Sequence, residues 1–261
     1  MTTVGMVLGS LCDMAPVERK MEFDNVGLLA GDAGQEVSRV LLCLDITMQA
    51  VEEARQQRCQ LIVSHHPLFF SLPKALRCDC YETARVTRLL QYGISAICMH
   101  TNLDCAAGGV CPGGVNDVLL QRLGLSAQGG LGEQALGRIG LCGQGMTAQA
   151  FARFVKQCLG CRVVRFVDGG RPVHRVAVVG GSGGDFVGEA LEAGCDTLVT
   201  ADVKHHEFLE AAERGLTLLD AGHYHTERPV LEAVRAFLEK RHPELTLVPS
   251  DTLVQDEVFA V

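Results

Sequence analysis

The hydrophobic positions of this chain fall into short apolar runs that alternate with amphipathic stretches. Runs of four to seven mostly apolar residues are typical of buried strands, and apolar residues spaced three or four apart are typical of helices. In the first part of the chain this pattern predicts strand Arg39–Asp45, helix Met48–Gln57, strand Leu61–Ser64, helix Tyr81–Tyr92 and strand Ile94–Met99.

The same order of elements returns later in the sequence. The pattern predicts strand Arg175–Gly181, helix Phe186–Ala193, strand Thr197–Thr200, helix His206–Arg214 and strand Leu216–Ala221. Ser64 lies 25 residues after Arg39, and Thr200 lies 25 residues after Arg175. A β-α-β-α-β unit implies parallel strands joined by crossover helices. We therefore predict an α/β protein with two similar domains that arose by internal duplication.

The stretch between the two repeats is rich in glycine and has few long apolar runs. It covers residues 126–145 and is the best candidate for a domain boundary. The end of the chain predicts an amphipathic helix at Pro229–Lys240 and a closing strand at Leu245–Val248. We accordingly expect a first domain of residues 1–125 plus 228–261 and a second domain of residues 126–227.

Composition narrows the class of protein. The net charge of −8 and the pI near 5.6 argue against a nucleic-acid-binding surface, which is usually basic. The sequence has neither an apolar stretch long enough to span a membrane nor the pattern of a signal peptide. Twelve cysteines in such a chain indicate reduced thiols and a cytoplasmic location. The pair Cys158 and Cys161 has no matching second pair, so we interpret both as packed thiols.

Three segments with candidate chemistry follow predicted strands. They are His65-His66, His100 to Asp104, and His223 to Glu227. Functional loops of parallel sheets lie beyond the carboxyl ends of the strands. His100 and Asp104 are four residues apart, as are His223 and Glu227, so each pair shares one face if its segment is helical. Imidazole and carboxylate are ligands of divalent metals, and the three segments together predict a metal site.

Other polar segments allow more than one interpretation. His205 is the fifth residue after its predicted strand, whereas His65 directly follows its strand, and we do not expect His205 and His206 to be ligands. Residues 180–185, rich in glycine, form either a phosphate cradle or a tight turn. Asp24 opens a turn-like segment and could also reach the site. Ser64 beside His65 is not expected to be a nucleophile, because the chain lacks the nucleophile-elbow motif around it.

Taken together, these segments resemble the NIF-three-like family, also labelled GTP cyclohydrolase I type 2-like. The resemblance runs from residue 24 to residue 227, nearly the whole chain, and its combined pattern is very specific. The matching segments are Asp24–Leu28, Ser64–Leu68, His100–Asp104, Gly113–Asp117, Gly180–Gly183, Thr200–His206 and Asp220–Glu227.

The resemblance implies a dinuclear metal site in a cleft between the two α/β domains. By position it implies the ligands His65, His66, Asp104, His223 and Glu227, with Glu227 bridging the two ions. His100 would lie beside the ions, as a ligand or as a catalytic base. The resemblance also implies a homo-oligomer, a toroidal hexamer.

The function that follows is a metal-dependent hydrolase with two divalent ions per chain. A hydroxide held between two ions can attack a nucleotide or another phosphorylated small molecule. His100 can move protons, because imidazole titrates near neutral pH. Zinc, iron, manganese and nickel all suit this ligand set. The alternative is a non-catalytic metal-binding adaptor or metal-handling factor, and a DNA-binding ring conflicts with the acidic charge.

Overall fold

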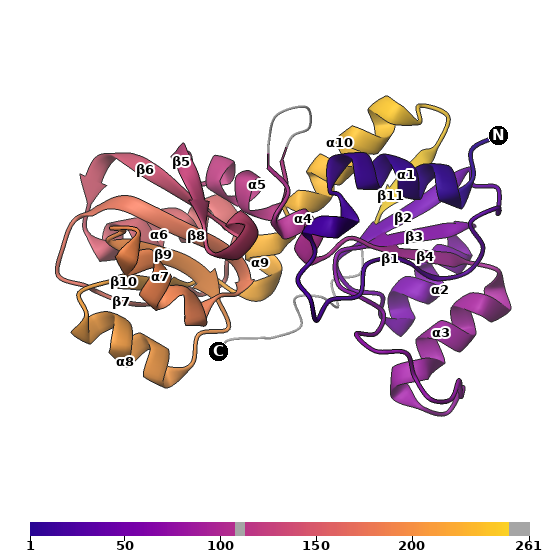
Figure 1. Cartoon of the computed structure of the whole chain (residues 1–261), viewed down its shortest axis with the longest axis horizontal. Helices are drawn as coiled ribbons and strands as arrows, with labels where there is room; N and C mark the ends of the chain where they lie inside the picture. Colours follow the sequence, from indigo (N-terminus) through magenta and orange to yellow (C-terminus); the bar gives the residue numbers. More distant parts are fainter. Residues whose placement is uncertain (108–112, 251–261) are drawn as a thin grey trace. The chain divides into compact units, whose positions relative to one another are not determined.

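The computed structural model describes residues 1–107 and 113–250, which form two compact units (Figure 1). Unit 1 contains Met1–Ala106 and, among the described residues, 231–250. Unit 2 contains the described residues from Ala107 to Val230. Each unit is built around its own mixed sheet with helices packed on it. The predicted α/β class with two domains of that kind is confirmed.

Unit 1 has a five-stranded sheet in the order β1-β4-β3-β2-β11. Strands β2, β3, β4 and β11 are parallel, and β1 is antiparallel beside β4. The elements are α1 (Val4–Met14), a 3₁₀ turn η1 (Val17–Arg19), β1 (Gly27–Ala30), β2 (Arg39–Cys43), α2 (Met48–Gln56), β3 (Leu61–Ser64), α3 (Tyr81–Tyr92), β4 (Ser95–Cys98), α4 (Thr101–Asp104), α10 (Val230–Arg241) and β11 (Thr246–Pro249).

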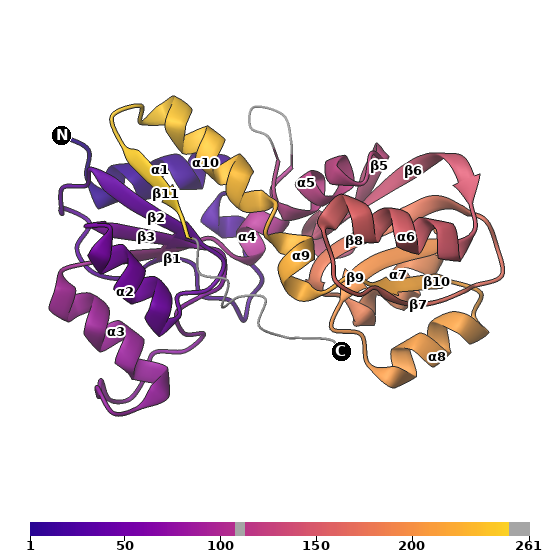
Figure 2. The ribbon, with the colours of Figure 1, turned by 180° about the vertical axis from the view of Figure 1, so that it is seen from behind.

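Helices cover both faces of the unit 1 sheet, which explains why its central strands are apolar throughout. Helices α2 and α3 lie on one face, and α1 and α10 lie on the other (Figures 1 and 2). Leu41 and Cys43 of β2 pack with α2 and α3, while the alternate residues Val40 and Leu42 are buried on the opposite side. A strand that is buried on both faces has apolar residues at successive positions of its sequence.

Unit 2 has a six-stranded sheet in the order β5-β6-β8-β9-β10-β7. Strands β8, β9 and β10 are parallel, while β5, β6 and β7 are antiparallel to their neighbours. The elements are α5 (Val115–Arg122), β5 (Ser126–Leu131), η2 (Glu133–Ala135), β6 (Gly137–Met146), α6 (Ala148–Leu159), β7 (Arg165–Val167), β8 (Val173–Ser182), η3 (Gly184–Phe186), α7 (Val187–Glu192), β9 (Thr197–Ala201), α8 (His205–Glu213), β10 (Thr217–Asp220) and α9 (His223–Glu227).

The core of unit 2 also lies on both faces of its sheet. Val176 and Val178 of β8 pack with α5 and α6, whereas Ala177 and Val179 pack with α7 and α8. This alternation follows from the two-residue period of a strand. Both units are therefore three-layer α/β/α structures, with the sheet in the middle.

The two units share one order of elements. Unit 1 runs β2-α2-β3-α3-β4, and unit 2 runs β8-α7-β9-α8-β10. An antiparallel strand stands beside the last parallel strand in each unit, β1 beside β4 and β7 beside β10. A short helix follows that last strand in each, α4 in unit 1 and α9 in unit 2. This order agrees with the β-α-β-α-β repeat of the sequence; the origin by duplication stays a prediction.

The glycine-rich stretch 126–145, predicted as the best candidate for a domain boundary, lies inside unit 2. It forms β5 and β6, which pair antiparallel in the unit 2 sheet. Its glycines allow close packing: a Cβ at Gly140 would press against Leu120 of α5 and against Leu125. Helix α5 therefore belongs with the second unit, and the chain divides after Ala106 instead of residue 125. Residues 251–261 of the predicted first domain lie outside the described residues.

Among the helices that the structure describes, none has both the length and the apolar character that crossing a membrane requires.

Candidate metal centre

Four of the predicted site residues gather at one edge of the unit 1 sheet. His65 and His66 directly follow β3, and His100 precedes α4, which ends at Asp104. Because β3 and β4 are parallel neighbours, with Ser64 opposite Cys98, the two segments leave the sheet side by side. One ring nitrogen of each of the three histidines lies within 4.8 Å of the others.

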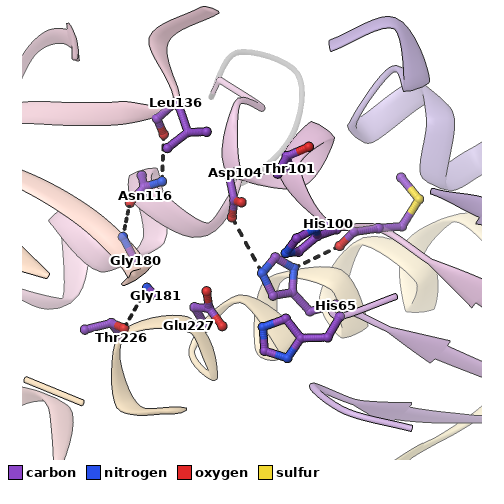
Figure 3. Close-up of polar contacts among 12 residues, drawn as sticks. His65, His100, Thr101, Asp104, Asn116, Leu136, Gly180, Gly181, Thr226 and Glu227 are labelled. Atoms are coloured by element: carbon purple, nitrogen blue, oxygen red, sulfur yellow. Dashed lines mark hydrogen bonds and ion pairs between the residues drawn. The ribbon is translucent and has the colours of Figure 1, made fainter. Parts of the chain in front are cut away.

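Each histidine ring in this cluster is held by its Nδ1 atom. Nδ1 of His65 lies 2.9 Å from the carbonyl oxygen of Met99, the residue after β4 (Figure 3). A carbonyl oxygen only accepts hydrogen bonds, so this Nδ1 carries the proton and Nε2 keeps its lone pair. His65 is buried, and its Nε2 is 3.6 Å from a carboxylate oxygen of Asp104.

Carboxylates hold the other two rings of the cluster in the same way. Nδ1 of His66 lies 2.9 Å from Asp45, and Nδ1 of His100 lies 2.9 Å from Asp24. An ionised carboxylate accepts a hydrogen bond from Nδ1–H, so the proton stays on Nδ1 and Nε2 again keeps its lone pair. Hydrogen bonds of this kind orient histidine ligands and raise their basicity at metal sites.

Asp24 is a buried anchor for the start of α4. Its carboxylate accepts hydrogen bonds from His100, from the backbone N–H and hydroxyl of Thr101, and from the backbone N–H of Asn25. Burial by itself raises the pKa of Asp24, but the hydrogen bonds from His100 and Thr101 outweigh it and hold the pKa far below its ordinary value. Asp24 is therefore ionised at neutral pH and fixes the orientation of His100.

The remaining two predicted residues form a pair in unit 2. His223 begins α9 and Glu227 ends it, four residues later. Nε2 of His223 lies 3.0 Å from Glu227, and its Nδ1 lies 2.6 Å from Asp202, which directly follows β9. With Nδ1 donating to Asp202, the Nε2 lone pair and the carboxylate of Glu227 face each other. These two groups, each with a lone pair, attract a proton or a metal cation.

A tight approach of backbone to side chain places Glu227. A Cβ on Gly181 would overlap the Glu227 carboxylate, and Gly181 has a left-handed φ of +66°. Its N–H donates to the Thr226 hydroxyl, and the preceding N–H, of Gly180, donates to the side chain of Asn116 (Figure 3). Glycine at position 181 therefore serves both the backbone conformation and the position of the carboxylate.

The structure also decides the other candidates. His205 and His206 begin α8, are exposed, and belong to no donor group among the described residues. A Cβ on Gly184 would overlap the carboxylate of Glu207, so the backbone here packs closely against an acidic side chain. The tight-turn interpretation of residues 180–185 is the one that fits. The Ser64 hydroxyl donates to the carbonyl oxygen of His66 and is oriented as a structural group.

Two carboxylates that orient histidines were missed by the sequence analysis. Asp45 lies just after β2, and Asp202 directly follows β9. The signal that identified His65 and His100, a polar residue at the carboxyl end of a parallel strand, applies to both of them. Lone aspartates are common in such loops, however, and only the folded chain shows which histidine each one contacts.

The donors of both units fit a divalent transition metal. Four imidazoles, those of His65, His66, His100 and His223, have Nδ1 engaged by an acceptor and Nε2 left with its lone pair. A carboxylate lies beside one Nε2 in each unit, Asp104 in unit 1 and Glu227 in unit 2. Neutral imidazole nitrogen and carboxylate oxygen are the donors that zinc, iron, manganese and nickel accept.

Comparisons with known proteins point in one direction. The family model described as Duf34/NIF3 (NGG1p interacting factor 3) matches residues 2–253. The chain is 33% identical over 242 residues to a Clostridium perfringens protein named GTP cyclohydrolase 1 type 2 homolog, covering 90% of both chains. It is 31% identical over 232 residues to the Helicobacter pylori protein named GTP cyclohydrolase 1 type 2, covering 87% of this chain and 88% of that one.

A solved structure shows the same likeness. The crystal structure of Staphylococcus aureus protein SA1388 matches with a TM-score of 0.88 at 26% sequence identity. The match covers 100% of this chain and 99% of that one.

Proposed function

The chain belongs to the Duf34/NIF3 family, and from this membership and its two sets of metal donors we propose that it is a dinuclear metal-dependent hydrolase. The proposed ligands are His65, His66 and Asp104 of unit 1 with His223 and Glu227 of unit 2. Together they would hold two divalent ions, with Glu227 shared between them. The substrate proposed is a nucleotide or another phosphorylated small molecule.

The observation that carries this proposal is the common orientation of the histidines. Each has Nδ1 committed to a backbone carbonyl or a carboxylate, and this arrangement is typical of metal-binding imidazoles. Divalent ions supply Lewis acidity, which polarises a substrate oxygen and lowers the pKa of water. The nucleotide part of the proposal is supported by the name that the Helicobacter pylori relative carries.

His100 is the residue to which we assign proton transfer. Its Nδ1 is fixed by the ionised Asp24, and its ring centroid lies 5.2 Å from that of His65 and 5.6 Å from that of His66. With Nδ1 bonded to Asp24, Nε2 is the ring nitrogen that can accept a proton from a nucleophile and return it to a leaving group. Asp24 is a positioning residue for this exchange.

Turnover by the metal-loaded protein tests the proposal. Nucleoside mono- and triphosphates and simple phosphate esters would be screened with zinc, iron, manganese and nickel, with phosphate release and opening of the purine ring both measured. We expect turnover that His100→Gln lowers by at least about a hundredfold while metal content stays unchanged. Full turnover in His100→Gln would contradict the assigned role, and His205→Gln, in an exposed histidine, is the matched control.

A second candidate function is a metal-binding adaptor. It is favoured by the family description, which names an interacting factor. A metal-loaded protein without turnover in the whole screen would support this candidate over the hydrolase.

For either function we propose a homohexamer, and light scattering after gel filtration would measure its mass.

A further inference from the structure

Unit 1 contains a pocket beside the histidine cluster, and none of the proposed metal ligands lines this pocket. The pocket has a volume of about 530 Å³ and lies between the loop after β3 and the start of α3. Its lining includes Phe69, Phe70, Lys74, Thr83 and Arg85. Pockets for small organic ligands usually have volumes of roughly 300–1,000 Å³, so this one has room for a ligand of nucleotide size.

An exposed aromatic ring connects the pocket to the cluster. Phe70 lines the pocket, is 56% exposed, and has its ring centroid 5.9 Å from that of His100. Phe23, 66% exposed, lies with its ring centroid 6.4 Å from that of Phe70. The side-chain amide of Asn25 donates to the carbonyl oxygen of Phe69 and ties the two segments together. Two neighbouring phenyl rings are therefore exposed to solvent beside the histidine cluster. A planar ring of a ligand can stack on them.

The pocket also carries positive charge that no described carboxylate neutralises. Arg85 donates from one terminal nitrogen to the carbonyl oxygen of Ile46. Its guanidinium carbon lies over the ring of Tyr81, 5.4 Å from the ring centroid. Its Nε is buried and has no hydrogen-bond partner among the described residues. Lys74 is exposed, and in the described part of the chain neither cation forms an ion pair. An anionic group would satisfy both side chains.

We propose that this pocket binds a planar-ring compound that carries an anionic group, such as a nucleoside phosphate. The ring stacks on Phe70, and the anionic group contacts Lys74 and Arg85. The inference rests on the proposed function in one respect: the ligand is the substrate of the adjoining metal centre. Binding itself depends on residues of unit 1 outside the proposed ligand set and does not need the metal.

A single tryptophan gives the test a direct readout. The chain contains no tryptophan, so Phe70→Trp introduces one reporter in the pocket and keeps an aromatic surface. Protein treated with a chelator would be titrated with GMP, guanosine and ribose 5-phosphate. We expect GMP to quench the tryptophan and to bind at least about tenfold more tightly than either part alone, because stacking and charge pairing each contribute.

Charge variants then separate the two contacts. In the Phe70→Trp protein, Lys74→Gln and Arg85→Gln should each weaken GMP binding about tenfold or more and leave guanosine binding unchanged. Lys156→Gln, in an exposed lysine of unit 2, should change neither. Thermal melting of each variant confirms folding, and calorimetry with the wild-type chain checks that the reporter does not create the binding.

The opposite results would overturn the assignment. GMP binding that survives Lys74→Gln and Arg85→Gln at full strength, or calorimetric binding without any change in tryptophan emission, would place the ligand elsewhere. No GMP binding by the metal-free chain would refute the pocket as a substrate site. Reloading the same preparations with metal and measuring their metal content separates the two proposals. Failed metal uptake with intact GMP binding refutes only the metal centre, and the reverse refutes only the pocket.

Discussion

Replacement of Asp24 by asparagine should remove much of the support for the start of α4. Asp24 is 6% exposed, and its carboxylate accepts four hydrogen bonds. One oxygen accepts from Asn25 and His100, and the other accepts from the backbone N–H and the hydroxyl of Thr101. The substitution keeps the shape of the side chain, removes its charge and turns one acceptor into a donor.

The cost follows from those contacts. Whichever oxygen becomes the amide NH₂, it faces a backbone N–H, of Asn25 or of Thr101, and that donor loses its partner. A buried unsatisfied donor costs about 1–3 kcal/mol, and hydrogen bonds to a neutral acceptor are weaker than those to a charged one. We expect Asp24→Asn to lower the free energy of unfolding by about 2–4 kcal/mol.

Urea unfolding of the metal-free protein at pH 7 measures this loss without a contribution from bound ions. With a slope of about 3 kcal/mol/M, the midpoint should fall by about 1 M. Asp32→Asn, in an exposed turn of the same unit, is the matched control and should stay within about 0.5 kcal/mol of wild type. A change for Asp24→Asn no larger than that of the control would refute the reasoning about the buried carboxylate.

Three further substitutions test other parts of the site. Gly181→Ala should destabilise the protein by about 2–3 kcal/mol, because residue 181 has a positive φ, and urea unfolding measures this loss. The same substitution should reduce metal uptake, because the new Cβ would displace the Glu227 carboxylate, and metal titration measures this effect. Asp202→Asn should weaken metal binding about 10–100-fold with little loss of stability, since this exposed carboxylate orients His223. Burial raises the pKa of Glu207, but hydrogen bonds at the start of α8 outweigh it and lower the pKa below its ordinary 4.5. Its contribution to stability is therefore present above pH 4.5 and is lost as the pH falls below it. Glu207→Gln should accordingly be less stable than wild type by about 1–2 kcal/mol at pH 7, and this difference should shrink as the pH falls below 4.5.

Each of these variants has a matched control in unit 2. Gly143→Ala places a Cβ in open space on an exposed part of β6, and Asp185→Asn and Glu213→Gln alter exposed acids. A Gly181→Ala or Asp202→Asn protein that binds metal as its control does would show that the carboxylate and the ring are not positioned as described. A constant stability difference between Glu207→Gln and wild type from pH 7 to pH 3 would contradict the lowered pKa.

The sequence was most informative where the local pattern and the tertiary environment agree. Strand Leu61–Ser64 and helix Tyr81–Tyr92 were predicted with the bounds that the structure has, because burial on both faces and a regular apolar spacing leave clear signals. Gly93 ends that helix with a left-handed φ of +63°, as expected of glycine after a helix. The histidines after β3 and β4 were predictable for the same reason, since the ends of parallel strands meet at one edge of the sheet.

The sequence was misleading where side chains are small or their partners are distant. The glycines of β6 look like a domain boundary because they lack apolar side chains, yet Gly140 needs its small size to pack against Leu120 of α5. Asp45 and Asp202 carry no local signal of their contacts with His66 and His223, each 21 residues away in the chain. Such pairings depend on which strands become neighbours, and a local pattern does not contain that information.

The metal content of the purified protein, determined by elemental analysis, tests the central proposal most directly. Wild type, His65→Ala and Glu227→Ala would be purified without added metal, reloaded and compared, with Glu213→Ala as the control. We predict about two transition-metal ions per chain in wild type and control. We predict loss of metal both in the unit 1 variant, His65→Ala, and in the unit 2 variant, Glu227→Ala. Less than about one ion per chain in reloaded wild type, or full occupancy in both ligand variants, would contradict a dinuclear centre built from these residues.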